Sequence, residues 1–143
     1  WTNFYKVDTI VIANDKVITD QTMQIAFKLA VPQGVTLSMK SLDGAAAVIN
    51  NPKHKARTIM VITRTMADAE YVCGKTGTEV RDVLIGGLRS GEGKKQIDMN
   101  SYMDGEDIAV MDRLEQKGIS VVMQADPTSR KLTTADIRKN FSR

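Results

Sequence analysis

Hydrophobic positions follow two different spacings along the chain. Short runs of β-branched and apolar residues, such as Thr9–Ala13, are typical of strands that are covered on both faces. Between these runs, apolar residues recur every three or four positions, as in a helix that buries one side. We therefore predict strands over Thr9–Ala13, Val35–Met39, Arg57–Thr63, Asp82–Ile85 and Ile119–Gln124.

Capping residues mark where the helices begin. Ser, Thr and Asp side chains accept hydrogen bonds from first-turn amides, and Gly or Pro commonly follows the last turn. Ser41, Thr65 and Asp104 are the expected caps of the three middle helices. The first predicted helix starts at a cap on Thr19 or Asp20 and runs through Leu29, and the last starts at a cap on Thr133 or Thr134 and runs through Phe141. The three between them are predicted over Leu42–Asn50, over Met66–Cys73 with Gly74 closing the helix, and over Gly105–Lys117.

This order of elements predicts the α/β class. Strands that alternate with helices form a mainly parallel central sheet with helices on both faces. A turn at residues 90–93 and the short segment Lys94–Met99 indicate a small edge hairpin. The chain of 143 residues has the usual size of one domain and contains no linker or repeat. We expect a single three-layer domain over residues 1–143.

Composition narrows the classes of function. The chain is 42% hydrophobic, enough for a real core, and no apolar run approaches the roughly 20 residues that span a bilayer. With one Cys and one His, no intrachain disulfide and no Cys-rich or His-cluster metal site is expected. A net charge of +3 is too balanced to indicate a nucleic-acid partner, but it suits an anionic ligand or an acidic partner.

The carboxyl ends of the predicted strands carry the candidate site. Ligands of open parallel sheets bind beyond these ends, and helix N-termini there attract anions. The candidate residues of this phosphate or active-site edge are Asn14, Asp15, Ser41, Arg64, Thr65, Gly86 and Gly87. The alternative is structural: such residues also end strands and cap helices, and Asp15 can form a turn with its own backbone.

Other chemical signals are weaker. The Gly-rich stretch after Ile85 has Leu88 and Lys95 where a phosphate-cradling loop needs Gly and Ser or Thr, and no dinucleotide motif follows the first strand. ATP, NAD and other cofactors therefore have no support. His54 is expected in a surface loop at the amino edge of the sheet, and Cys73 as a small buried hydrophobe.

Several stretches, taken in order, resemble one family. They are Ile10–Val17 with its Asn14-Asp15 pair, Leu29–Val35, Val83–Gly87, Gly93–Ile97, and the closing segment from Leu114 to Thr128. Their order and spacing are similar to those of the IIB component of bacterial sugar phosphotransferase systems (PTS), in the mannose/fructose/sorbose and N-acetylgalactosamine class. The sequence departs from that family at Gly87, where the family has Asn.

The resemblance implies a phosphocarrier. Such a IIB component accepts a phosphoryl group from a IIA phosphohistidine and passes it to a sugar imported by IIC and IID membrane subunits. It is a cytoplasmic transferase subunit that associates peripherally with the permease, and homo-oligomers are possible. The family's phosphorylated histidine precedes a Trp that Trp1 resembles, so the catalytic His and the start of the natural domain are expected upstream of residue 1. None of the catalytic groups would then lie in this chain.

On this interpretation, Asn14 and Asp15 shape the pocket, while Ser41, Arg64 and the amides of Gly86 and Gly87 are candidates for holding phosphate. The alternative function is a non-enzymatic α/β module that binds a small anion or nucleotide as a regulatory unit.

Overall fold

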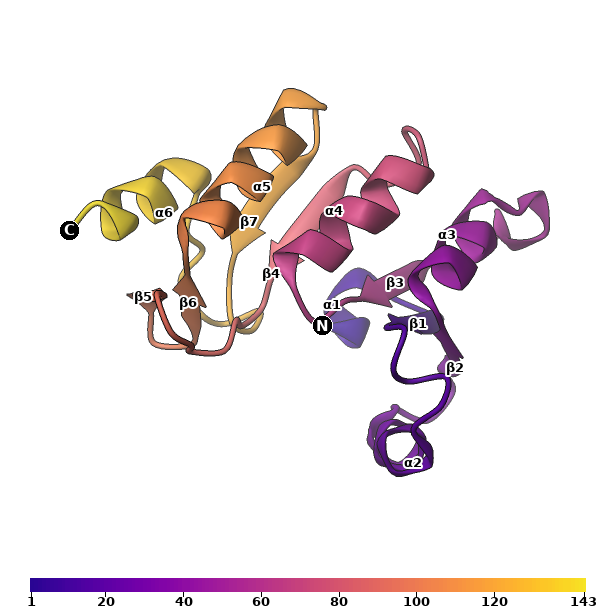
Figure 1. Ribbon diagram of the computed structural model, residues 1–143. Helices are drawn as coiled ribbons and strands as arrows, with labels where there is room; N and C mark the ends of the chain where they lie inside the picture. The colour runs from indigo at the N-terminus through magenta and orange to yellow at the C-terminus, as the bar shows by residue number, and fades with distance from the viewer. The chain divides into compact units, whose positions relative to one another are not determined.

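The computed structural model describes residues 1–143 and has helices and strands in the predicted alternation (Figure 1). Its α/β class with parallel strands is confirmed. The helices are α1 (Thr2–Tyr5), α2 (Gln21–Ala30), α3 (Leu42–Asn50), the short 3-10 helix η1 (Pro52–His54), α4 (Met66–Lys75), α5 (Gly105–Gln116) and α6 (Thr134–Phe141). The strands are β1 (Thr9–Ala13), β2 (Thr36–Lys40), β3 (Ile59–Ile62), β4 (Asp82–Ile85), β5 (Lys95–Asp98), β6 (Ser101–Met103) and β7 (Ser120–Met123).

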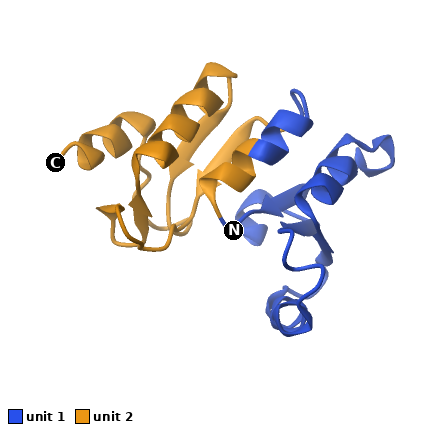
Figure 2. Ribbon diagram, in the orientation of Figure 1, with its two compact units in different colours: residues 1–64, 71–79 blue, residues 65–70, 80–143 orange.

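The chain divides into two compact units (Figure 2). Unit 1 comprises residues 1–64 and 71–79, and unit 2 comprises residues 65–70 and 80–143. Helix α4 contributes to both, because its first residues belong to unit 2 and its last to unit 1. The single domain expected over residues 1–143 stays a prediction.

Unit 1 is built on a parallel sheet in the order β2-β1-β3. The central strand β1 is buried along its whole length, and successive side chains point to opposite faces. Ile10 and Ile12 pack in one cluster with side chains of α2, whereas Val11 and Ala13 pack in another with side chains of α3 and α4. Helices therefore cover both faces of this sheet, as the sequence predicted.

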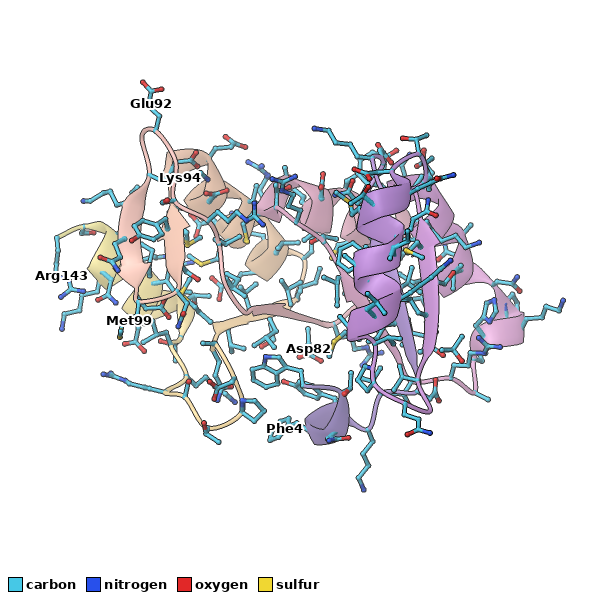
Figure 3. The ribbon with its side chains drawn as sticks, turned by 90° about the horizontal axis from the view of Figure 1, so that it is seen from below. Phe4, Asp82, Glu92, Lys94, Met99 and Arg143 are labelled. Carbon is cyan, nitrogen blue, oxygen red and sulfur yellow. The ribbon has the colours of Figure 1, made fainter.

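Unit 2 contains two strand pairs. Strands β4 and β7 are parallel, while β5 and β6 form an antiparallel hairpin with an irregularity between Gln96 and Asp98. Figure 3 shows Glu92 at the tip of the loop before β5, and Met99, at the turn of the hairpin, is 89% exposed. The predicted strand over Lys94–Met99 corresponds to β5, but the hairpin turns at residues 99–100 rather than 90–93, and its second strand β6 was not predicted. The core of this unit includes the fully buried side chains of Met103, Met111, Leu114, Met123 and Ile137.

Hydrogen bonds confirm the predicted caps. The cap of α2 is Asp20 rather than Thr19, and that of α6 is Thr133 rather than Thr134. Ser41 and Thr65 accept from first-turn amides of α3 and α4, and Asp104 forms a capping box with Asp107 at the start of α5.

Three local predictions need correction. Gly74 does not end α4, because the helix continues to Lys75 and the left-handed residue is Gly77, with φ of 59°. Strand β3 is shorter than Arg57–Thr63. Helix α1 was not predicted; it is too short for a periodic signal, and ring stacking between Trp1 and Tyr5 accompanies it. None of the helices combines the length and the apolar character that a bilayer crossing requires.

Candidate functional site

The loop after β1 is shaped by Asn14. The Asn14 amide donates to the carbonyl oxygen of Lys40 at 3.0 Å, which extends the pairing of β1 with β2 by one step. The Asn14 side-chain oxygen accepts from the Lys16 amide at 2.7 Å, a local turn typical of Asn. The turn that the sequence allowed for Asp15 is therefore made by Asn14, and the Asp15 side chain is free to act elsewhere.

Asp15 and Ser41 together cap α3. The Leu42 amide donates to Asp15 Oδ1 at 2.9 Å, and the Gly44 amide donates to Ser41 Oγ at 3.0 Å. A carboxylate at this position is also stabilised by the positive end of the helix dipole. Two of the four amides that a helix start leaves unsatisfied are thus occupied by the protein's own side chains. In this structure Asp15 and Ser41 act as caps, the structural alternative left open by the sequence.

A tyrosine–aspartate contact joins α4 to α3 within unit 1. The Tyr71 hydroxyl donates to Asp43 Oδ1 at 2.6 Å. This hydrogen bond raises the pKa of Tyr71, and the negative charges of Asp43 and Asp15 raise it further. Sequence reasoning missed this pair because its members are 28 positions apart and belong to different elements, so no local pattern links them.

Arg64 lies beyond the end of β3. Because β1 and β3 run parallel with Ile12 level with Ile62, Arg64 leaves the sheet at the same edge as Asn14. Its side chain is exposed, and no carboxylate forms an ion pair with it. Unit 1 therefore brings Asn14, Asp15, Ser41 and Arg64 to one edge, and Arg64 is the cation of this set that remains available to an anion.

The other three candidates belong to unit 2. The Thr65 hydroxyl accepts from the Asp68 amide at 3.1 Å and so serves as the cap of α4. Gly86 and Gly87 follow β4 and are exposed. A Cβ atom at Gly87 would lie 3.3 Å from the carbonyl oxygen of Asn100, at the hairpin turn, so a side chain at this position would be crowded.

His54 and Cys73 lie away from this edge. The prediction that His54 is a surface-loop residue was partly wrong, because it ends η1, is half-buried, and has a buried Nδ1 without a hydrogen-bond partner. Cys73 is buried, as predicted, with 5% of its surface exposed. No group of three or more His, Cys, Asp or Glu side chains is arranged to hold a metal ion.

At this edge of unit 1, a capped helix start and the unpaired cation of Arg64 follow the ends of parallel strands. This arrangement is typical of α/β proteins that bind anionic ligands. The comparison with protein families makes the class specific. The family model of the PTS system sorbose subfamily IIB component matches residues 1–141, and the chain belongs to this family.

Relatives and solved structures agree with this membership. The chain is 29% identical to the sorbose-specific EIIB component of Lacticaseibacillus casei over 140 residues, which are 95% of this chain and 84% of that protein. It is 26% identical to the mannose-specific EIIAB component of Escherichia coli (strain K12), covering 96% of this chain but only 42% of that longer protein. The IIBSor domain of the sorbose permease from Klebsiella pneumoniae has the same fold, with a TM-score of 0.90 at 24% identity over 97% of this chain and 85% of that one. The predicted family and its class, a phosphotransferase-system IIB subunit, are confirmed.

Proposed function

We propose that this chain is the body of a phosphocarrier that accepts a phosphoryl group from a IIA phosphohistidine and delivers it to an incoming sugar. The match of the IIB family model across residues 1–141 is the observation that supports this proposal. In the first step the phosphorus–nitrogen bond of the donor breaks while a new one forms on the acceptor imidazole, which loses its ring proton. In the second step this phosphorus–nitrogen bond breaks while a phosphorus–oxygen bond forms on a sugar hydroxyl; the hydroxyl loses its proton and the imidazole regains one.

The acceptor histidine is proposed to precede Trp1 on a segment that begins the natural domain. This follows from the resemblance, in which Trp1 corresponds to the family Trp that comes shortly after the phosphorylated histidine. His54 is not proposed as the acceptor, since it precedes β3 at the opposite edge of the sheet.

Arg64 is the residue of the edge that we propose to neutralise the transferring phosphate. Phosphoryl transfer depends on positioning and charge stabilisation more than on covalent help from the protein. The exposed Arg64 guanidinium can supply a charged fork at the carboxyl edge. Asn14, Asp15 and Ser41 hold the surrounding loop and helix start of unit 1, while Thr65, Gly86 and Gly87 of unit 2 remain candidates for holding phosphate.

The proposed partners are a IIA protein or domain and the IIC and IID membrane subunits, with this chain on the cytoplasmic side and bound peripherally to the permease. Self-association into a homo-oligomer is compatible with this role, and no nucleic-acid partner is proposed. Beyond the family match, the charge balance of 20 basic and 17 acidic residues agrees with a protein partner rather than a nucleic acid.

Labelling the natural full-length protein tests the site of phosphorylation. Incubation with phosphorylated carrier proteins should place acid-labile radiolabelled phosphate on a histidine before Trp1. The chain that begins at Trp1 is the matched control and should remain unlabelled. Label on that control would contradict the assignment, whatever the activity of the full-length protein.

The role of Arg64 is tested in the same assay. Arg64→Gln should lower the rate of phosphoryl transfer by about 10- to 100-fold, the usual effect of losing a hydrogen bond to a charged group. Lys28→Gln, which removes an exposed cation from the last turn of α2, should leave the rate unchanged. Equal rates for Arg64→Gln and the parent protein would remove Arg64 from the proposed site.

A further inference from the structure

Helix α2 of unit 1 is apolar on two sides. Its inner side carries Met23 and Phe27, which pack against the buried cluster on one face of the sheet. On its outer side, Ile25 exposes 58% and Leu29 83% of its surface. A surface helix normally buries its one apolar side, and a helix with apolar residues all round is normally covered all round. The outer side of α2 therefore has the character of a contact surface.

Small uncharged residues surround these two side chains. Thr22 and Ala26 are exposed and lie three or four positions from Ile25 and Leu29, so the four residues form one stripe along the helix. We call them the outer stripe of α2. Figure 1 shows α2 on the opposite side of the β2-β1-β3 sheet from α3, so neither helix covers the other. Small residues beside large apolar ones let a second helix approach closely.

The start of α2 is tied to the core of unit 1. The Met23 amide donates to Asp20 Oδ1 at 3.0 Å, which caps the helix. The Gln24 side-chain amide donates to the carbonyl oxygen of Val17 at 2.7 Å, and the Val17 side chain is fully buried. The outer stripe is thus presented by a helix that is already ordered, so a partner pays little conformational entropy for α2 on binding.

The charges at the two ends of α2 favour a second copy of the same helix. Asp20 lies at the start and Lys28 in the last turn, and neither forms an ion pair within the chain. Two antiparallel copies bring Lys28 of one toward Asp20 of the other, and they also place opposite ends of the helix dipoles side by side. Parallel copies would bring like charges together. A bilayer surface is less suitable, because it attracts helices with many cations and Lys28 is the only charged residue within α2.

We infer that the outer stripe of α2 binds a second copy of this chain, with the two α2 helices packed antiparallel about a two-fold axis. Ile25 and Leu29 form the apolar centre of the contact, and Lys28 pairs with Asp20 of the other copy at its rim. A helix of ten residues is about 15 Å long, too short to bury the about 800 Å² per partner of a standard interface, so the dimer is weak, with a Kd of about 0.1–1 mM. The contact does not depend on the proposed phosphotransfer, because it uses no residue assigned to that reaction.

Sedimentation equilibrium of the full-length protein tests the association. Between about 10 μM and about 2 mM we expect a monomer–dimer equilibrium, with amide NMR shifts at α2 that depend on concentration. Association should stop at the dimer, because a two-fold contact uses the same surface on both copies and closes on itself. A protein that stays monomeric at the highest concentration, or that forms larger assemblies, overturns the inference.

Apolar variants locate the contact. Leu29→Gln should weaken dimerisation about tenfold or more, because each dimer loses two apolar contacts. Met99→Gln is the matched control, since Met99 is 89% exposed in unit 2 and should have no effect. Unfolding curves establish that each variant is folded. Equal weakening by both variants would show non-specific apolar attraction, and a dimer that tolerates Leu29→Gln would place the contact elsewhere; either result overturns the assignment.

Charge variants test the antiparallel arrangement. Lys28→Gln and Asp20→Asn should each weaken dimerisation by about 2- to 10-fold, because either change removes both rim pairs of the dimer, while Asn can still cap the helix. The double variant should dimerise no more weakly than either single variant, because both changes remove the same pairs. Lys53→Gln, which removes an exposed cation from η1, is the control. Stronger dimerisation of Lys28→Gln would indicate parallel helices, and additive losses in the double variant would show that the two charges do not meet; both results contradict the arrangement.

Discussion

The contact between Asp15 and α3 gives a sharp prediction about the carboxyl edge. Asp15→Ala removes the acceptor of the Leu42 amide, which lies 2.9 Å from Oδ1. Loss of an N-terminal cap typically costs about 1 kcal/mol, within a range of about 0.5–2 kcal/mol. Ser41→Ala should cost a similar amount, because Ser41 accepts from a different amide, that of Gly44. If the two caps are independent, the double variant loses about 2 kcal/mol.

The nature of the replacement separates the hydrogen bond from the charge. Asp15→Asn keeps an oxygen that can accept from Leu42 but removes the negative charge at the helix N-terminus. It should therefore cost only the dipole contribution, about 0.3–1 kcal/mol. Both Asp15 variants should also lower the pKa of Tyr71, since the charge of Asp15 contributes to its elevation.

Urea unfolding and amide hydrogen exchange measure these effects. Exchange of the Leu42 amide should become about fivefold faster in Asp15→Ala for a loss of 1 kcal/mol, while that of Gly44 should respond to Ser41→Ala. Lys16→Ala, which changes the adjacent exposed side chain, is the control. Unchanged unfolding together with unchanged Leu42 exchange in Asp15→Ala would refute the capping role.

Three other perturbations test the two units. Leu114 is fully buried on α5, so Leu114→Ala should lower the free energy of unfolding by about 3 kcal/mol, measured by urea denaturation. The hydrogen bond from the Asp107 amide lowers the pKa of Asp104 below its ordinary 3.8. The stabilisation that the ionised Asp104 gives the folded state is therefore complete above pH 3.8 and is lost as the pH falls through the folded pKa. Asp104→Asn should make the free energy of unfolding depend less on pH in this acid range. The pKa of Tyr71 is raised above 10.0 because its hydroxyl donates to Asp43. The stabilisation from this hydrogen bond is therefore present below pH 10.0 and is lost as the pH rises through the folded pKa. A spectrophotometric titration should show the raised pKa, and Tyr71→Phe should abolish the alkaline loss of stability in unfolding measurements.

Much of the local structure could be predicted because its causes lie within a few residues. The caps Ser41, Asp104 and Thr133 each bond an amide three positions on, so their effect is already present in the sequence. The buried strand Thr9–Ala13 has an unbroken apolar pattern and was predicted with its observed bounds. Gly74 failed as a stop signal because glycine permits a helix end without requiring one.

The carboxyl edge shows where prediction from sequence ends. Parallel strands fix which side of the sheet Asn14 and Arg64 occupy, so their common edge followed from the pattern alone. The sequence did not decide that Asp15 caps a helix starting 27 positions later, or that Tyr71 reaches Asp43. Those hydrogen bonds form only when separate elements pack together, because the partner of each side chain is set by distances in space rather than along the chain.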